Sequence, residues 1–337
     1  MTTLADVARE AGVSVMSVSN VLRGKPTVSD SIRERVLAAA DKLDYRVNIA
    51  AKSLRSGRTG VIGLAVPRLE MPFHAQFAAE ATSAAEARGV QVMVQQTHSR
   101  PETELSLLRG AAASLVDGTI LCTVSSDPAD LEPASKGHAL ILFDEQIENT
   151  TLDVISCPNH EGSRDAGRHL MSKGCRTIAA VGTSLATVGH SPIPGGGIDH
   201  RWAGINAALE DFPGTRLIPV PCAWDSEAAR RALSAVLATG PSIDGVFAMT
   251  DSMALGALRA LADHGLRVPQ DVRVIGFDGI AEGAWSTPSL STVSIGIPQI
   301  AHTAVEMLLH RMGTPLDQEP GHRFTPSYTL IERESSR

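Results

Sequence analysis

The sequence of 337 residues is poor in aromatic side chains and in cysteine, and it has no long apolar run. The cysteines are far apart and form no C-x-x-C pair, which argues against a zinc ribbon or a disulfide framework and predicts reduced thiols in or near the core. They are Cys122, Cys157, Cys175 and Cys222. The longest apolar runs, such as Val61–Pro67, are far below the roughly 20 residues that a membrane-spanning helix needs. We therefore expect no contact with a membrane.

Several short motifs of enzymes are also missing. The chain has no G-x-G-x-x-G, no P-loop and no G-x-S-x-G, and His160, His190 and His200 lack the spacing of metal ligands. We therefore expect no catalytic residue, no metal and no cofactor. The first ten residues, MTTLADVARE, contain acidic side chains and no apolar core of a signal peptide, which predicts a cytoplasmic protein.

The net charge of −7 is unevenly distributed along the chain. Residues 1–58 carry ten Lys and Arg against six Asp and Glu, so this part is basic, and the remainder has a net charge of −11. Because neutralisation of phosphates by Lys and Arg dominates affinity for nucleic acids, a basic head on an acidic body predicts that the head approaches DNA. A chance local excess of charge is the alternative.

Three short helices are predicted in this head, over Leu4–Ala11, Val15–Leu22 and roughly 31–43. Thr3 followed by Asp6 resembles a capping box, and Gly12 permits the left-handed turn that ends the first helix. Apolar positions in the second helix fall at Val18, Val21 and Leu22, which leaves Val15, Met16, Ser17, Ser19 and Asn20 on its remaining surface. Two helices joined by a three-residue turn result.

From residue 61 onward, apolar strands alternate with helical patterns. The strands are expected at 61–67, 90–95, 118–124 and 139–143, and then near 176–182, 217–222, 244–249 and 272–277. The helices are expected at 73–88 and 102–115, and then near 160–173, 201–210, 226–238 and 251–264. This alternation predicts parallel sheets with helices on both faces, and two series predict two lobes. Since open parallel sheets bind ligands at the carboxyl ends of their strands, a ligand is expected between the lobes.

The segment from Thr3 to Leu64 resembles the head of the lactose-repressor and galactose-repressor (LacI-GalR) family nearly position for position. RWAGI at 201–205, TDSMALGALRAL at 250–261 and GLRVPQDVRVIGFD at 265–278 resemble the motifs of the family's sensor domain. The resemblance covers nearly the whole chain. It implies an all-α helix-turn-helix head joined to an α/β, two-lobed domain like the periplasmic binding proteins.

The resemblance also implies the division of the chain and its partners. The helix-turn-helix domain is expected at 1–46, a hinge helix and linker at 47–59, and the ligand-sensing domain at 60–337. The first lobe is expected at 60–158 and 292–320, and the second at 159–291 and 321–337. The expected protein is a homodimer, or a tetramer, that binds double-stranded operator DNA as a repressor. Its small-molecule effector is expected to be polar and sugar-like or nucleoside-like; whether it releases or promotes DNA binding is open.

Helix-turn-helix proteins place the start of their second helix in the major groove. The resemblance implies base contacts by Val15, Met16 and Asn20, of which Asn20 could bond adenine at two positions. Ser14, Ser17 and Ser19 are expected to hold phosphates, and Thr3 is grouped with them. In the hinge, Asn48 is expected to cap a helix, Ala51 to permit close pairing of two helices, and Leu54 to wedge into the minor groove. Ordinary surface roles, or a core role for Leu54, are the alternatives.

The resemblance further implies an effector site in the two-lobed domain. Arg201 and Asp278 occupy positions where relatives hold polar groups of the ligand, and Trp224 and Phe73 occupy positions of aromatic contacts. Thr250 replaces an asparagine that relatives commonly have. For each residue the alternative is structural: Trp224 and Phe73 as core, and Arg201 with Asp278 as an ion pair. Two other classes also compete, an enzyme acting on a sugar or nucleoside and a sugar receptor without a role in DNA binding.

Overall fold

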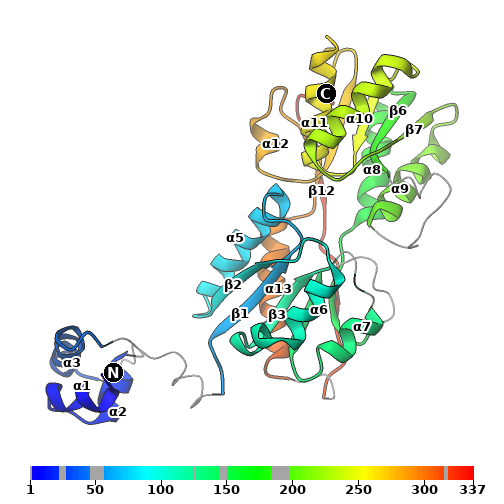
Figure 1. The fold of residues 1–337 in the computed structure, drawn as a ribbon. Helices are drawn as coiled ribbons and strands as arrows, with labels where there is room; N and C mark the ends of the chain where they lie inside the picture. Colours follow the sequence, from blue (N-terminus) through cyan, green and yellow to red (C-terminus); the bar gives the residue numbers. More distant parts are fainter. Residues whose placement is uncertain are drawn as a thin grey trace. The chain divides into compact units, whose positions relative to one another are not determined.

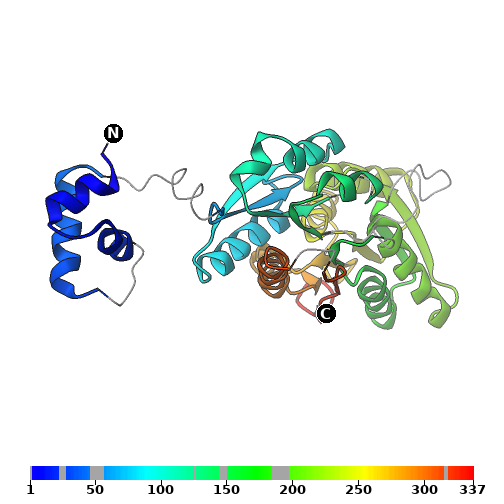
Figure 2. The ribbon, with the colours of Figure 1, turned by 90° about the horizontal axis from the view of Figure 1, so that it is seen from below.

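The computed structural model describes residues 2–22, 28–45, 57–123, 126, 128–143, 150–183, 197–314 and 318–337. The chain divides into two compact units, Met1–Thr59 and Gly60–Arg337. Figures 1 and 2 show the helical first unit and the two-sheet second unit. In the described residues, no helix is both long and apolar enough to cross a membrane.

The first unit is a bundle of three helices, α1 (Leu4–Ala11), α2 (Val15–Leu22) and α3 (Asp30–Lys42). The predicted bounds of α1 and α2 are confirmed, and α3 begins one residue earlier than expected. Their apolar sides form one core that includes Val7, Val18 and Val36, each fully buried. The unit therefore has its own core, built from contacts close in sequence.

Helix α1 is held by hydrogen bonds at both of its ends. Thr3 and Asp6 form the predicted capping box at the start of α1, and Gly12 ends it with a left-handed φ of 63°. From α3, Arg35 donates to the carbonyl oxygens of Ala11 (Nε, 3.1 Å) and Gly12 (Nη2, 2.9 Å). A charged donor on the last carbonyls of α1 fixes the angle at which α2 follows it.

The first sheet of the second unit has the strand order β11-β5-β4-β3-β1-β2. All of its pairings are parallel. The strands are β1 (Val61–Val66), β2 (Gln91–Gln96), β3 (Gly118–Cys122), β4 (Ala139–Phe143), β5 (Asp153–Ile155) and β11 (Arg323–Phe324). Side chains alternate between two cores: Leu64 packs with α5 (Pro72–Glu86) and α13 (Ile297–Arg311), whereas Ala65 packs with α6 (Pro101–Arg109) and α7 (Pro128–Ala134). Helices thus cover both faces, as predicted (Figure 2).

The second sheet has the order β12-β10-β9-β8-β6-β7. Its strands are β6 (Thr177–Thr183), β7 (Arg216–Pro221), β8 (Gly245–Ala248), β9 (Arg273–Asp278), β10 (Ser291–Ser294) and β12 (Thr329–Ile331). Its helices are α8 (Asn159–Ser172), α9 (Gly197–Ala207), α10 (Ser226–Thr239), α11 (Asp251–Asp263) and the short α12 (Glu282–Trp285). Helices α8 and α9 pack against each other, as do α10 and α11. The sheet is parallel, as predicted, except that β12 pairs antiparallel with β10.

The chain passes between the two sheets after β5, after β10 and after β11. The boundaries expected at residues 292 and 321 are each misplaced by a few residues. β10 continues to Ser294 in the second sheet, and β11 at Arg323–Phe324 still belongs to the first. In both sheets the first strand lies between the second and the third. Open α/β sheets with this arrangement generally bind ligands at the carboxyl ends of these strands.

One predicted helix is divided in two. The helix expected over 102–115 ends as α6 at Arg109, Gly110 adopts an extended backbone, and a 3-10 turn follows at Ala111–Leu115. A Cβ at Gly110 would lie 2.8 Å from the carbonyl oxygen of Ser106, so the backbone reverses there because this residue has no side chain.

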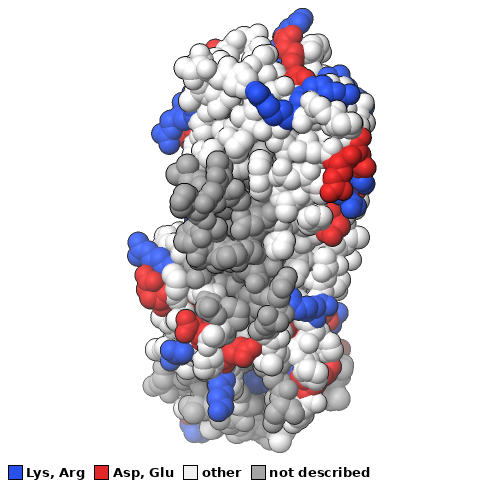
Figure 3. Space-filling view, turned by 90° about the vertical axis from the view of Figure 1, so that its right-hand side faces the viewer, with Lys and Arg blue, Asp and Glu red and all other residues white. Residues whose placement is uncertain are grey.

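All four cysteines lie in the described residues and are thiols rather than disulfides, as predicted. Cys122 and Cys175 are buried, and burial raises the pKa of Cys175 to about 11. On the face of the molecule in Figure 3, side chains of both charge signs lie next to one another over the described part. The acidic excess of the second unit is therefore not gathered into one patch on that face.

Candidate functional sites

Arg201 is the centre of a buried polar cluster in the second lobe. It lies on α9 with 6% of its surface exposed, and its Nε donates to Oδ1 of Asn159 at 2.8 Å. One terminal nitrogen, Nη1, donates to the carbonyl oxygen of Met249, which follows β8. The guanidinium lies over the Phe277 ring, 4.0 Å from its centroid, and 5.3 Å from that of Trp224. The side chain is thus fixed by aromatic faces and by acceptors from two other elements.

Asp278 is the acidic partner of Arg201. It is the last residue of β9 and is 5% exposed, and its Oδ1 lies 3.5 Å from Nη2 of Arg201. Its backbone has a φ of 120°, a conformation that side chains rarely adopt and that costs on the order of 1–3 kcal/mol. Burial raises the pKa of Asp278 to about 7, although the charge of Arg201 opposes this rise. Such strain at a buried charged residue is typical of functional sites.

A second buried carboxylate, Asp251, lies at the first residue of α11. Its Oδ2 accepts hydrogen bonds from the backbone N–H groups of Gly279 (2.8 Å) and Ile280 (2.9 Å). Burial and the nearby Asp278 raise the pKa of Asp251 well above its ordinary value. The carboxylates of Asp251 and Asp278 therefore lie near a single guanidinium, that of Arg201. One positive charge beside two carboxylates favours a proton bound to one of the two.

Three polar atoms in this cluster are buried and have no hydrogen-bond partner in the described structure. They are Nδ2 of Asn159, Oγ1 of Thr183 and Oδ1 of Asp251. Thr183 ends β6, as Asp278 ends β9, so both lie at the carboxyl ends of parallel strands. Leaving a buried polar group unpaired costs free energy, roughly 1–3 kcal/mol each. A small molecule with several hydroxyl or amide groups could supply the missing partners.

The other three predicted effector residues differ in their location and in their contacts. Trp224 is half-buried beside Arg201, and its Nε1 donates to the carbonyl oxygen of Gly182 at 2.9 Å. Thr250 is buried and its Oγ1 accepts from the N–H of Met253, which makes it the cap of α11. Phe73 lies in the first lobe, at the start of α5, half-buried and stacked against Phe77 and Phe143. The structure thus groups Arg201, Asp278 and Trp224, with Thr250 serving a helix cap nearby.

The sequence interpretation did not assign Asn159 and Asp251. Asp251 is inside the TDSMALGALRAL motif, directly after Thr250, and its position at the start of a helix was the available signal. Asn159 is the first residue of α8, belongs to no recognisable motif and reaches Arg201 only through the fold. Its contact depends on two segments more than 40 residues apart.

In the first unit, the predicted DNA-contacting residues of α2 lie on its exposed side. Val15 and Met16 are 43% and 70% exposed, which is unusual for apolar side chains in a bundle with an adequate core. Oγ of Ser14 accepts from the N–H of Ser17 at 3.1 Å and so caps α2. Ser19 and Asn20 are half-buried. Asn48, Ala51 and Leu54, with the expected hinge helix, lie outside the described residues.

Thr3 and Ser14 therefore have local roles as helix caps that are independent of DNA. Both hydroxyls remain at the start of a helix, where N–H groups attract anions such as phosphate. A cap and a phosphate contact are compatible, since a hydroxyl has one donor and two acceptor positions.

The arrangement defines a class of protein: a small helix-turn-helix unit joined to a two-lobed α/β unit that contains a buried polar cluster. Comparison with known families agrees, because "Bacterial regulatory proteins, lacI family" matches residues 3–48 and "Periplasmic binding protein-like domain" matches residues 168–336. The chain belongs to the LacI family of bacterial regulatory proteins.

Relatives match along the whole chain. The ribose operon repressor of Halalkalibacterium halodurans is 31% identical over 338 residues, which cover 100% of this chain and 98% of the relative. The HTH-type transcriptional repressor PurR of Erwinia tasmaniensis is 32% identical, with 99% and 97% covered. Because these relatives are transcriptional repressors, the interpretation as a sugar- or nucleoside-processing enzyme is excluded.

Solved structures give the same result. A lac repressor dimer bound to operator and the anti-inducer ONPF is similar with a TM-score of 0.82 and 26% identity, covering 99% of both chains. A LacI family transcriptional regulator from Arthrobacter sp. FB24, in complex with lactose, has a TM-score of 0.71 and 28% identity, covering 82% of this chain and 99% of that one. The predicted fold class is therefore confirmed.

Proposed function

We propose that this chain is a transcriptional repressor whose affinity for operator DNA is controlled by a sugar-like molecule bound between its two lobes. The observation that carries the proposal is the buried Arg201–Asp278 pair at the carboxyl end of β9, together with the buried polar atoms of Asn159 and Thr183 that have no hydrogen-bond partner in the described structure. A neutral ligand with many hydroxyl groups matches such a site, because hydroxyls both donate and accept. The lactose complex of the Arthrobacter regulator supports the same ligand class.

In this proposal, Arg201 and Asp278 bind polar groups of the effector, and Trp224 and Phe73 offer apolar faces to its ring. Thr250 lines the site while it caps α11. The first lobe comprises residues 60–158 and about 295–324, and the second comprises the rest of the second unit. Movement of the lobes on binding would change the spacing of the two hinge segments and so couple the effector to DNA.

On the DNA side, we propose that Val15, Met16 and Asn20 contact base edges and that Ser14, Ser17, Ser19 and Thr3 contact the backbone. A homodimer would present two such helices to a palindromic operator. For the hinge at residues 47–59, Asn48, Ala51 and Leu54 keep their proposed roles in capping, pairing and minor-groove wedging. The head before it comprises residues 1–46.

The test is a fluorescence anisotropy titration of the full chain with DNA from upstream of its own gene. Specific binding should weaken steeply with salt and should change when the effector is added. Effectors would be sought among sugars, polyols and nucleosides by thermal shift, because a ligand of the native state raises apparent stability. Binding to operator and random DNA with equal affinity would contradict a role as a specific repressor.

Arg201 requires a variant design that separates ligand binding from folding. Removing one partner of a buried ion pair leaves an uncompensated charge and costs about 3–5 kcal/mol of stability. Arg201→Lys keeps the charge but loses the fork of donors, so it should fold, bind operator and lose the effector response. Asn206→Ala on the same helix is a matched control that should respond like the parent. A normal effector response in Arg201→Lys would return Arg201 to a structural role.

A further inference from the structure

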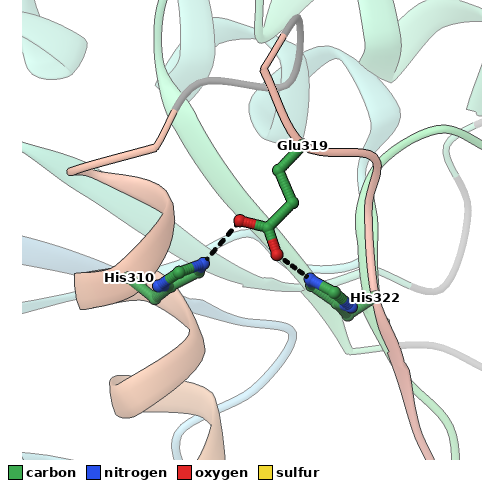
Figure 4. Close-up of side chains that lie close together, drawn as sticks. All are labelled: His310, Glu319 and His322. Atoms are coloured by element: carbon green, nitrogen blue, oxygen red, sulfur yellow. Dashed lines mark hydrogen bonds and ion pairs between the residues drawn. The ribbon is translucent and has the colours of Figure 1, made fainter.

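Two histidines and one glutamate form a cluster at the end of α13, apart from the sites described above (Figure 4). His310 lies in the last turn of α13, whereas Glu319 and His322 belong to the segment that leads into β11. Nε2 of His310 is 2.9 Å from Oε2 of Glu319, and Nε2 of His322 is 2.6 Å from Oε1. The two imidazoles thus face opposite oxygens of one carboxylate, and the ligand atoms lie within 4.8 Å of one another.

We propose that His310, Glu319 and His322 bind a divalent transition-metal ion, for which Zn²⁺ is the best match. Two imidazole nitrogens with one carboxylate oxygen are a known ligand set of zinc, whereas Mg²⁺ and Ca²⁺ prefer oxygen ligands alone. Bonds of 2.0–2.2 Å in a tetrahedral site place ligand atoms about 3.3 Å apart. The two nitrogen-to-oxygen distances, 2.9 and 2.6 Å, are shorter than this value, so the rings would have to rotate slightly away from Glu319 to admit the ion.

The spacing of the ligands also favours a metal. Glu319 and His322 are three residues apart, and His310 approaches from a different element. A close pair of ligands plus one from elsewhere in the fold is the usual composition of a three-residue metal site. The fourth position would face solvent, because His310 and His322 have 53% and 55% of their side chains exposed.

A buried ion pair next to the cluster fixes the backbone of the residues that carry these ligands. Arg311 binds Asp153 through Nε (2.6 Å) and Nη2 (3.1 Å), and both side chains are 3% exposed. Nη1 of Arg311 also donates to the carbonyl oxygen of Glu319 at 2.8 Å. Oδ1 of Asp153 accepts from the backbone N–H of His322 at 2.7 Å. The Arg311–Asp153 pair therefore positions the backbone of Glu319 and His322. Arg311 also directly follows His310 in the sequence.

Gly321 holds the loop close to the neighbouring strand. Its N–H donates to the carbonyl oxygen of Thr151, and a Cβ at this position would lie 2.3 Å from that oxygen. Only glycine allows this approach, which brings Glu319 and His322 to the side of α13. Preorganised ligands of this kind bind a metal without the cost of ordering a flexible loop.

The charge around the cluster is suited to a cation. Among the described residues, the ion pairs of the Glu319 carboxylate are with these imidazoles and none is with Lys or Arg. A simple contact of Glu319 with two histidines, without any metal, is the competing explanation.

The proposed ion would lie at the amino-terminal edge of the first sheet. His322 precedes β11, which pairs with β5 and then continues to the third passage between the sheets. The ion would join the last turn of α13 to this segment and stabilise the first lobe. This inference does not depend on the identity of the effector.

The experiment is isothermal titration of the full, untagged chain with Zn²⁺, together with Co²⁺, whose visible absorption reports coordination geometry. One ion per chain is expected, with an increase in melting temperature. His310→Ala and His322→Ala should each weaken binding at least about tenfold, since even the loss of an outer partner of a metal ligand costs about 10- to 100-fold. Glu319→Gln, which keeps the shape of the side chain, should also weaken it.

His302→Ala provides a matched control, because His302 is an exposed histidine two turns earlier on α13. This variant should bind Zn²⁺ like the parent. The three ligand variants should fold normally without metal, which circular dichroism would check. The proposal would be overturned if no stoichiometric binding occurred, or if His310→Ala and His322→Ala bound the ion as tightly as His302→Ala.

Discussion

The side chain of Gln76 joins the two lobes through Glu282. Nε2 of Gln76, on α5 of the first lobe, donates to Oε2 of Glu282 in α12 of the second lobe at 2.7 Å. Oε1 of the same amide accepts from the backbone N–H of Ala281 at 3.3 Å. The Gln76 side chain therefore makes two hydrogen bonds between the lobes, which would have to approach each other around a ligand bound between them.

Gln76→Ala should weaken effector binding about two- to tenfold, because a net hydrogen bond contributes about 0.5–1.5 kcal/mol to the approach of the lobes. Isothermal titration with the sugar identified by thermal shift would measure the change. Gln270→Ala, at an exposed glutamine of the second lobe, is the control and should bind like the parent. An unchanged affinity in Gln76→Ala would show that this bridge does not contribute to closure.

Asn20→Ala should reduce specific operator affinity by about 1–3 kcal/mol and leave binding to random DNA nearly unchanged. This is the expected effect of one lost contact to a base edge. Anisotropy titrations on both DNAs at the same salt concentration would measure it, with Asn206→Ala in the second lobe as the control. Equal losses on the two DNAs would instead assign Asn20 to a phosphate contact.

The pH dependence of stability should contain a contribution from Asp278. Its pKa in the native state, about 7, is above the ordinary value of 3.8, so the native state holds more protons than the unfolded state between these values. The contribution of Asp278 to the free energy of unfolding should therefore decrease as pH rises from about 4 to about 7. Asp278→Asn should remove this slope. Denaturant titrations across this range would compare the slopes, and identical slopes would contradict the raised pKa.

Arg311→Ala should lower the free energy of unfolding by about 3–5 kcal/mol, because it leaves Asp153 buried without its counter-charge. The exposed pair of Arg267 and Asp271 offers a comparison with similar geometry, at 2.7–2.8 Å, on the surface. Arg267→Ala should change stability little, since solvent screens exposed pairs. Urea denaturation would measure both variants. Similar losses in the two would show that burial does not determine the contribution of these ion pairs.

The longer helices and strands could be predicted from sequence because each is long enough to show the full spacing of its apolar residues. α1 and α2 were found with their exact bounds, and the buried strand Ala139–Phe143 was found exactly as well. The short strands β5, β10, β11 and β12 were missed. Two to four residues are too few to show a periodicity, and such strands form because a neighbouring strand offers hydrogen bonds. Helix α13 was also missed, although its apolar residues have helical spacing.

The residues of the candidate sites were likewise predicted only in part. Arg201 and Asp278 were assigned to one site from sequence, with an ion pair as the structural alternative, and the structure forms that ion pair. Asn159 was not predicted, because its contact with Arg201 depends on the packing of α8 against α9. The His310–Glu319–His322 cluster was also missed. The Glu319-x-x-His322 spacing was visible, but only the fold brings His310 beside it.

The two strands that complete the sheets, β11 and β12, are made late in translation. While the ribosome is still adding residues 323–331, β5 and β10 each lack a neighbour in their sheets. Unpaired strand edges are prone to wrong pairing and aggregation. The head, whose core comes from residues 4–45, can fold as soon as it leaves the exit tunnel. A nascent chain of this protein therefore carries a finished DNA-contacting unit on an unfinished body, and a chaperone that covers the open edges of β5 and β10 would protect it during that interval.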